Sequence, residues 1–154
     1  MPEEYSLQTS IAINAPAKKV FDVMLDLTRF DEWNPFRVMD PTSVSTVTQK
    51  KPGVGSTYDY VGKRIGRGRM LVTEASRPSV IVEEMTFYNR KTETARVEFR
   101  LVEEAAGTLV TWSMTGTRGL GGRLMTKLLN LDKMMGKTFA QGLEKLKTLV
   151  ESGK

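Results

Sequence analysis

The longest hydrophobic pattern in the chain covers its C-terminal stretch, residues 121–150. Apolar residues recur there at spacings of three and four, while lysine and glutamate occupy the opposite face. The pattern predicts one amphipathic helix, about 45 Å long at a rise of 1.5 Å per residue. Gly142 lies on the apolar stripe, where glycine costs about 1 kcal/mol relative to alanine, so this position requires either close packing or room.

Alternation of apolar and polar residues predicts strands over most of the remaining chain. The first strand covers residues 5–14. From Val44 onward, turn residues separate further strands, expected at 57–61, 69–75, 80–88, 93–102 and 108–117. Consecutive strands joined by tight turns are antiparallel. The inner rows of the last two strands are expected to be Ala95, Val97, Phe99, Leu101, Thr108, Val110, Trp112 and Met114.

Two short helices are predicted after the first strand. Pro16 suits the first position of a helix, because its missing N–H would be unpaired there anyway. The segment Thr28–Asp31 has the spacing of a capping box and predicts a second helix, which ends before Pro35. One long helix over one face of an antiparallel sheet makes the protein α+β.

The composition excludes several kinds of chemistry. The chain of 154 residues contains no cysteine and no histidine, which rules out disulfides, thiol nucleophiles and the commonest general base and metal ligand. We therefore expect no metal and no cofactor, and a single domain spanning residues 1–154. No apolar run is long enough for a transmembrane span or a secretory signal, so the expected location is cytoplasmic. The net charge of +5 permits an anionic partner without requiring one.

Several short motifs along the chain together resemble one superfamily. They are Ile11-x-Ile13-x-Ala15-Pro16-x-x-x-Val20-Phe21, Trp33-Asn34-Pro35-Phe36, Gly53-x-Gly55-Ser56-x-Tyr58, Val72-Thr73-Glu74, Thr108-x-Val110-Thr111-Trp112 and Met135-Gly136-x-x-Phe139-x-x-Gly142-Leu143. With them the chain resembles the SRPBCC (START/birch-pollen-allergen-like) superfamily, and within it the polyketide cyclase/dehydrase branch. The resemblance covers essentially the whole chain.

This resemblance implies a helix-grip fold, a bent antiparallel sheet of about seven strands wrapped around the long C-terminal helix. Members of the superfamily bind lipids, sterols, polyketides and other apolar molecules, and some cyclise or dehydrate them. The main hypothesis is therefore a protein that binds an apolar or aromatic small molecule between the sheet and the C-terminal helix. A cofactor-free cyclase or dehydratase is the alternative, so whether the chain is an enzyme stays open, as does a homodimer.

The residues expected to line such a cavity are the large apolar and aromatic side chains of the inner rows. Nine methionines in the chain favour an adaptable interior, because methionine fills irregular or ligand-filled spaces. Simple core packing is the competing interpretation for each residue. The expected lining residues are Trp33, Phe36, Tyr58, Tyr60, Met70, Met85, Phe87, Phe99, Trp112, Met114, Met135 and Phe139.

Three carboxyl groups are candidates for acid–base chemistry, together with Tyr58. Asp132 lies beside the apolar stripe of the long helix, and strand parity places Glu74 and Glu83 with inward-facing neighbours. A carboxyl group in an apolar pocket has its pKa raised by desolvation and can act as an acid or a base. A β-bulge would reverse the parity of the two glutamates, and nothing in the sequence pairs the tyrosine with a base.

Two glycine-containing basic segments complete the candidates. Residues 63–69 carry four positive charges in a predicted hairpin, so a protein, membrane or RNA interaction is a third hypothesis, although nucleic acid is not the expected partner. A solvated strand tip is the competing interpretation. Residues 118–123 are predicted to form a pliant joint that lets the long helix shift as a cavity opens.

Overall fold

The computed structural model describes residues 3–49, 51–88, 92–118 and 125–153, and their side chains except those of 3–5 and 117–134. The elements, in chain order, are β1 (Glu3–Ile13), α1 (Ala17–Leu25), the 3-10 helix η1 (Leu27–Glu32), α2 (Phe36–Met39), β2 (Val44–Thr48), β3 (Thr57–Gly62), β4 (Gly66–Ser76), β5 (Val80–Tyr88), β6 (Thr92–Glu104), β7 (Gly107–Arg118) and α3 (Met125–Glu151). The predicted joint at 118–123 lies almost wholly outside the described residues.

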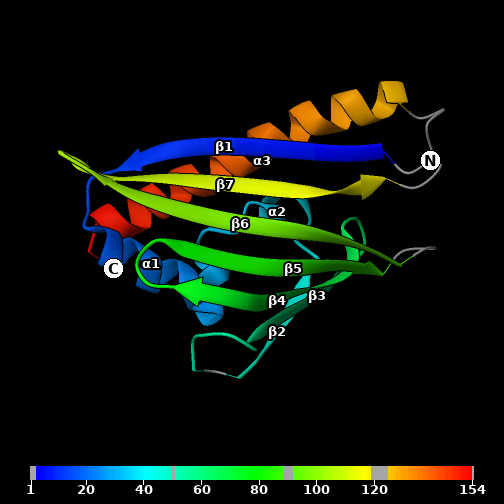
Figure 1. Ribbon diagram of the computed structural model, residues 1–154. Coiled ribbons are helices and arrows are strands. Elements are labelled where there is room, and N and C mark those ends of the chain that lie inside the picture. Colours follow the sequence, from blue (N-terminus) through cyan, green and yellow to red (C-terminus); the bar gives the residue numbers. More distant parts are fainter. Residues whose placement is uncertain (1–2, 50, 89–91, 119–124, 154) are drawn as a thin grey trace.

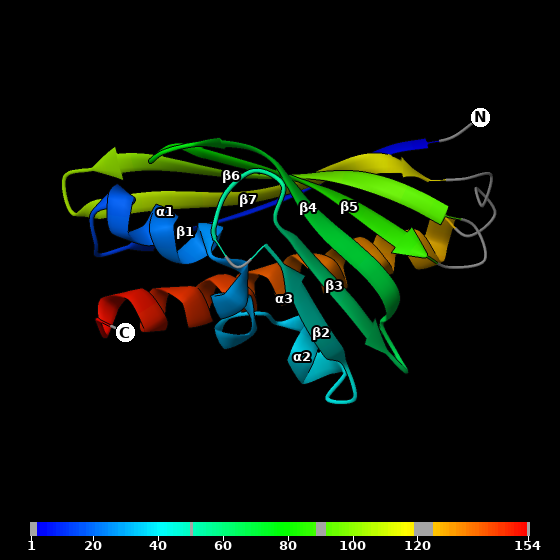
Figure 2. The ribbon, with the colours of Figure 1, turned by 90° about the horizontal axis from the view of Figure 1, so that it is seen from below.

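The seven strands form one antiparallel sheet in the order β1-β7-β6-β5-β4-β3-β2 (Figure 1). Because β1 pairs with β7, the first and last strands are neighbours, and β2 is left at the far edge. The helices α1, α2 and α3 lie on the same side of the sheet, which curves over α3 (Figure 2). The predicted α+β architecture, with short helices after the first strand and a long C-terminal helix, is confirmed.

The predicted inner rows form the core. Phe99 and Trp112 are directly opposite each other on β6 and β7, and both are almost fully buried. The C-terminal half of α3 closes over this region with four side chains, each at most 1% exposed: Phe139, Leu143, Leu146 and Val150. Burial of such side chains stabilises the fold by about 1.5–3 kcal/mol each, so periodicity was sufficient to locate the core.

The placement of Glu74 on the inner face is wrong. Val72 pairs with Glu83 and Glu74 pairs with Val82, so a β-bulge inserts Thr73 between them. One extra residue reverses the parity of every following side chain on the strand. The Thr73 hydroxyl donates to the Val82 carbonyl at 3.3 Å across the bulge. Glu74 is exposed, whereas Glu83 on the regular strand faces inward as predicted.

The predicted capping box at Thr28–Asp31 is also wrong. The side chain of Asp26 caps η1, accepting from the Thr28 backbone N–H at 3.1 Å and from the Thr28 hydroxyl. The segment forms a 3-10 helix and not an α-helix. Asp31 is consequently free for contacts outside its own helix. A further short helix, α2, follows Pro35 where the sequence indicated no helix.

Gly142 is required for close packing. A Cβ added there would lie 2.8 Å from Cδ of Pro35 and 3.2 Å from Cζ3 of Trp112. We expect Gly142→Ala to lower the free energy of unfolding by about 1–3 kcal/mol through overpacking, despite the better helix propensity of alanine.

Gly136 of the same helix is a matched control, since an added Cβ there meets no atom within 4 Å. Gly136→Ala should therefore stabilise the protein by about 1 kcal/mol, from propensity alone. Chemical denaturation of both variants measures the difference. Stabilisation by both substitutions would mean that the space beside Gly142 is open.

Candidate functional site

Glu83 occupies the middle of the concave face of the sheet. Its strand partners are Val72 on β4 and Val97 on β6, and Val97 is in turn opposite Met114 on β7. The neighbouring pairs on this face are Met70 with Met85 on one side and Ile81 with Phe99 on the other. The register therefore surrounds one carboxyl group with apolar side chains.

Glu83 is a buried acid with an oxygen atom that no described residue pairs with. The residue is 1% exposed, and within the described part of the chain its Oε1 atom has no hydrogen bond. Burial raises the pKa of Glu83 from 4.5 to about 8, because the interior solvates a carboxylate far less well than water does. At neutral pH this group is consequently a neutral carboxylic acid, which can both donate and accept a hydrogen bond.

Two indole nitrogens are likewise buried without a hydrogen-bond partner among the described residues. They are the Nε1 atoms of Trp33 and Trp112. Buried polar groups in proteins are almost always paired with protein or bound water, so each exception requires an explanation. With Oε1 of Glu83, the described part of the interior contains three buried polar atoms without a hydrogen-bond partner.

Five of the twelve predicted lining residues form a continuous aromatic cluster. The Trp112 and Phe139 rings are stacked at 4.1 Å between centroids, and Trp33 meets Trp112 edge to face at 5.8 Å. Phe99 contacts both tryptophans, and Phe36 contacts Phe139. Their mutual contacts give these residues a core role, whether or not a ligand also touches them.

The remaining predicted residues lie mostly toward the other end of the concave face. Tyr60 packs over Gly68, whose absent side chain leaves room for the tyrosine ring, and Phe87 is the β5 partner of that glycine. Tyr60, Met85, Phe87 and Met135 are half-buried, while Met70 and Met114 are buried. Large adaptable side chains that are incompletely covered are the usual lining of small-molecule sites.

Tyr58 belongs to a polar network that sequence reasoning did not find. Its hydroxyl donates to Asp31 and accepts from the Asn34 amide at 3.1 Å. Burial and the bond to Asp31 raise the pKa of Tyr58 to about 12. Burial alone would raise the pKa of Asp31, but hydrogen bonds from Tyr58 and Ser45 outweigh it and hold that pKa below its ordinary value. The tyrosine proton is thus committed to Asp31, tying η1 to β3.

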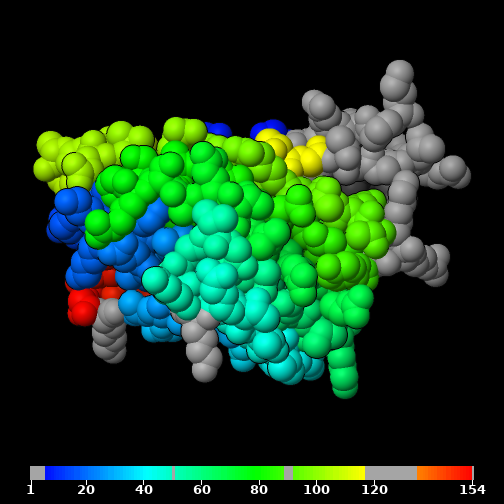
Figure 3. Space-filling model, turned by 60° about the horizontal axis from the view of Figure 1, so that its bottom comes forward, coloured from blue at the N-terminus to red at the C-terminus, as the bar shows by residue number. Residues whose placement is uncertain are grey.

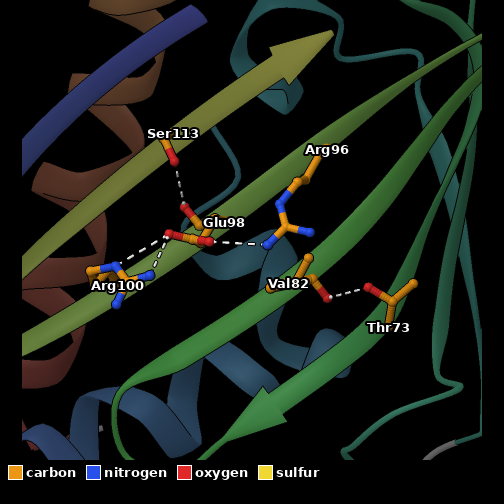
Figure 4. A network of polar contacts seen from close by, with 6 residues as sticks. All are labelled: Thr73, Val82, Arg96, Glu98, Arg100 and Ser113. Atoms are coloured by element: carbon orange, nitrogen blue, oxygen red, sulfur yellow. Dashed lines mark hydrogen bonds and ion pairs between the residues drawn. The ribbon is translucent and has the colours of Figure 1, made fainter.

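The outer face of the sheet carries a separate set of polar contacts (Figure 4). Glu98 lies between Arg96 and Arg100, with ion-pair distances of 3.2 and 3.0 Å. In this view the helices are behind the sheet, so these charges face solvent and not the interior. A hollow of about 350 Å³ beside this network is lined by residues including Thr73, Val82 and Arg96, and also by Glu83.

Hollows of about 350 to 510 Å³ are lined by described residues, and none of these linings contains residues of both the sheet and α3. The side chain of Asp132 lies outside the described residues, so its candidacy stays a prediction, as do the cavity and its lining. The described residues contain no cluster of three acidic side chains that could hold a metal. No helix in the described ranges is long and apolar enough to cross a membrane.

The fold and its concave face define a class of protein, the α+β helix-grip proteins. Residues 5–151 match the family model described as "Polyketide cyclase / dehydrase and lipid transport". The chain belongs to this family, as its motifs indicated. A search of curated proteins found no match.

Similar solved structures share the fold at low sequence identity. A protein from Mesorhizobium loti is 16% identical with a TM-score of 0.72, and the match covers 97% of this chain and 99% of that one. Norcoclaurine synthase from Thalictrum flavum, in complex with dopamine and hydroxybenzaldehyde, is 9% identical with a TM-score of 0.71, covering 99% and 90%. The Aha1 dimer from Colwellia psychrerythraea is 16% identical with a TM-score of 0.69, covering 97% and 98%.

Proposed function

We propose that this protein binds an apolar or aromatic small molecule, lipid- or polyketide-like, between the concave face of the sheet and α3. The observation that carries the proposal is Glu83, a buried neutral acid among apolar side chains, whose Oε1 atom has no hydrogen-bond partner in the described part of the chain. Ligand sites of this kind are mainly apolar, with a few polar groups that orient the ligand. The bound aromatic molecules of norcoclaurine synthase support an aromatic ligand on this fold.

The half-buried end of the face is the better location for the ligand. Tyr60, Met85 and Phe87 are half-buried there and are not among the five residues of the aromatic cluster around Trp112. A ligand carbonyl or hydroxyl group would then be oriented by Glu83. The unpaired indole nitrogens of Trp33 and Trp112 add two donors deeper in the interior.

Native mass spectrometry of the purified protein, followed by titration with 2-naphthol, tests the proposal. We expect a co-purified apolar molecule or saturable naphthol binding. Glu83→Leu should weaken naphthol binding about tenfold, because a buried hydrogen bond to the ligand is lost. Glu84→Leu is the matched control, since Glu84 is the exposed neighbour on the same strand. Absence of both a bound molecule and naphthol binding would refute the proposal.

A cofactor-free cyclase or dehydratase is the second candidate, and the elevated pKa of Glu83 is the observation that favours it. A carboxylic acid that keeps its proton near pH 7 is a suitable general acid. Catalysis also requires a partner for the proton, and Tyr58 is already bonded to Asp31. The ligand recovered after incubation distinguishes the two functions: a carrier returns it unchanged, whereas an enzyme returns a cyclised or dehydrated product.

A further inference from the structure

Near the β2 edge of the sheet, exposed valines and cations lie together on the surface. Val44 on β2 is directly opposite Val61 on β3, and Val61 is opposite Arg67 on β4. Val44 is 64% exposed and Val61 is 52% exposed. The turn from β3 to β4 adds Lys63 and Arg64, both exposed. We refer to these five residues as the β2–β4 tip.

The cations of the β2–β4 tip are available for an external anion. Among the described residues, Lys63, Arg64 and Arg67 form no ion pair, whereas Arg69 farther along β4 is paired with Asp59 at 2.6 Å. The Arg67 guanidinium lies 4.7 Å from the centroid of the Tyr88 ring, a cation–π contact that supplies no formal negative charge. Three cations without an ion-pair partner among the described residues therefore adjoin two exposed valines.

A buried carboxylate holds this surface in place. Asp40 is fully buried and accepts from the backbone N–H groups of Arg64 at 2.7 Å and Ile65 at 3.0 Å. Hydrogen bonds from the Thr42 hydroxyl and from these backbone groups lower the pKa of Asp40 to about 2, so the tie persists at neutral pH. The turn projects from the lower right of the molecule (Figure 3, green), where a flat surface can reach it.

We propose that the β2–β4 tip docks on the surface of an anionic lipid membrane. The cations would face the headgroups, and the valines would enter the boundary between headgroups and acyl chains. Each cation near an anionic membrane raises the binding constant about fivefold, so three of them give about a hundredfold. A nucleic acid would use the cations but not the valines, and Arg67 lies over one face of the Tyr88 ring, on which a base could otherwise stack.

Co-sedimentation with vesicles tests this proposal, which is independent of the ligand proposal. The protein should bind phosphatidylcholine–phosphatidylserine vesicles and not phosphatidylcholine vesicles, and added salt should weaken the binding. The triple variant Lys63→Gln/Arg64→Gln/Arg67→Gln should bind about a hundredfold more weakly. The double variant Val44→Asn/Val61→Asn should bind about tenfold more weakly, because apolar contact with the membrane is lost.

Two controls match these variants in chemistry but lie elsewhere. Val54→Asn replaces a valine that is 57% exposed in the loop at the opposite end of the β2–β3 hairpin, and Lys18→Gln/Lys19→Gln removes exposed cations from α1. Both should bind vesicles as the unaltered protein does. Lack of binding by the unaltered protein, an equal loss in the controls, or no effect of the valine pair would overturn the proposal. Tighter binding to single-stranded RNA than to the anionic vesicles would overturn it as well.

Discussion

The free energy of unfolding is expected to fall by about 3 kcal/mol between pH 4.5 and pH 7 because of the titration of Glu83 alone. The variant Glu83→Gln should not show this loss. Below pH 4.5 the carboxyl is protonated in both the folded and the unfolded chain, so it has no effect on the pH dependence. As the pH rises, the unfolded chain releases this proton, whereas the folded protein keeps it until about pH 8. Stability consequently falls by about 1.4 kcal/mol per pH unit.

Urea denaturation of the two proteins at several pH values between 4.5 and 8 measures this effect. Glu84→Gln is the control. It removes the exposed neighbouring carboxyl group and leaves every other titrating group of the molecule in place. Parallel pH profiles for the unaltered protein and Glu83→Gln would show that Glu83 is paired or hydrated in solution. The same experiment thus tests the observation on which the proposed function depends.

Trp33→Ala is expected to lower the free energy of unfolding by about 3–5 kcal/mol. The indole is 1% exposed and makes edge-to-face contacts with Phe30 at 4.8 Å, Trp112 at 5.8 Å and Phe99 at 5.9 Å. Its removal leaves a cavity in the aromatic cluster and forfeits ring contacts worth about 0.5–1.5 kcal/mol each. Thermal or chemical denaturation measures the loss.

Phe87→Ala is the comparison that separates core from candidate ligand site. Phe87 is half-buried at the other end of the concave face, so its truncation should cost less than half as much as that of Trp33. Phe87→Ala should change the free energy of naphthol binding by more than it changes the free energy of unfolding. Equal destabilisation by the two substitutions would contradict the division of the concave face into a packed end and an adaptable end.

The fold was predictable because its signals are local and repeated. Alternation with period two over residues 95–101 is enough to place Val97 and Phe99 on the inner face, and the apolar stripe is enough to place Phe139 and Leu146. Each of these patterns repeats along its own element, so a single deviating residue does not hide it.

The candidate site was predictable only in part. The sequence ranked Glu74 and Glu83 equally, and the bulge at Thr73 separated them, because one inserted residue turns the first outward and leaves the second inward. Asp31 was missed as the partner of Tyr58, since the two are 27 residues apart and nothing local links them. From the sequence, Gly142 was compatible with either open space or close packing. The positions of Pro35 and Trp112 show that the packing there is close.

By itself, the sequence determined the class of protein, the order of its strands and of its long helix, and the residues of its core, because hydrophobic burial follows the period of each helix or strand. It also excluded histidine and cysteine chemistry. The tertiary structure alone decided which tyrosine is already bonded and, among the described residues, which buried acid has an unpaired oxygen and which cations beside exposed valines form no ion pair. These outcomes depend on strand register and on contacts between distant segments, and no local pattern encodes either.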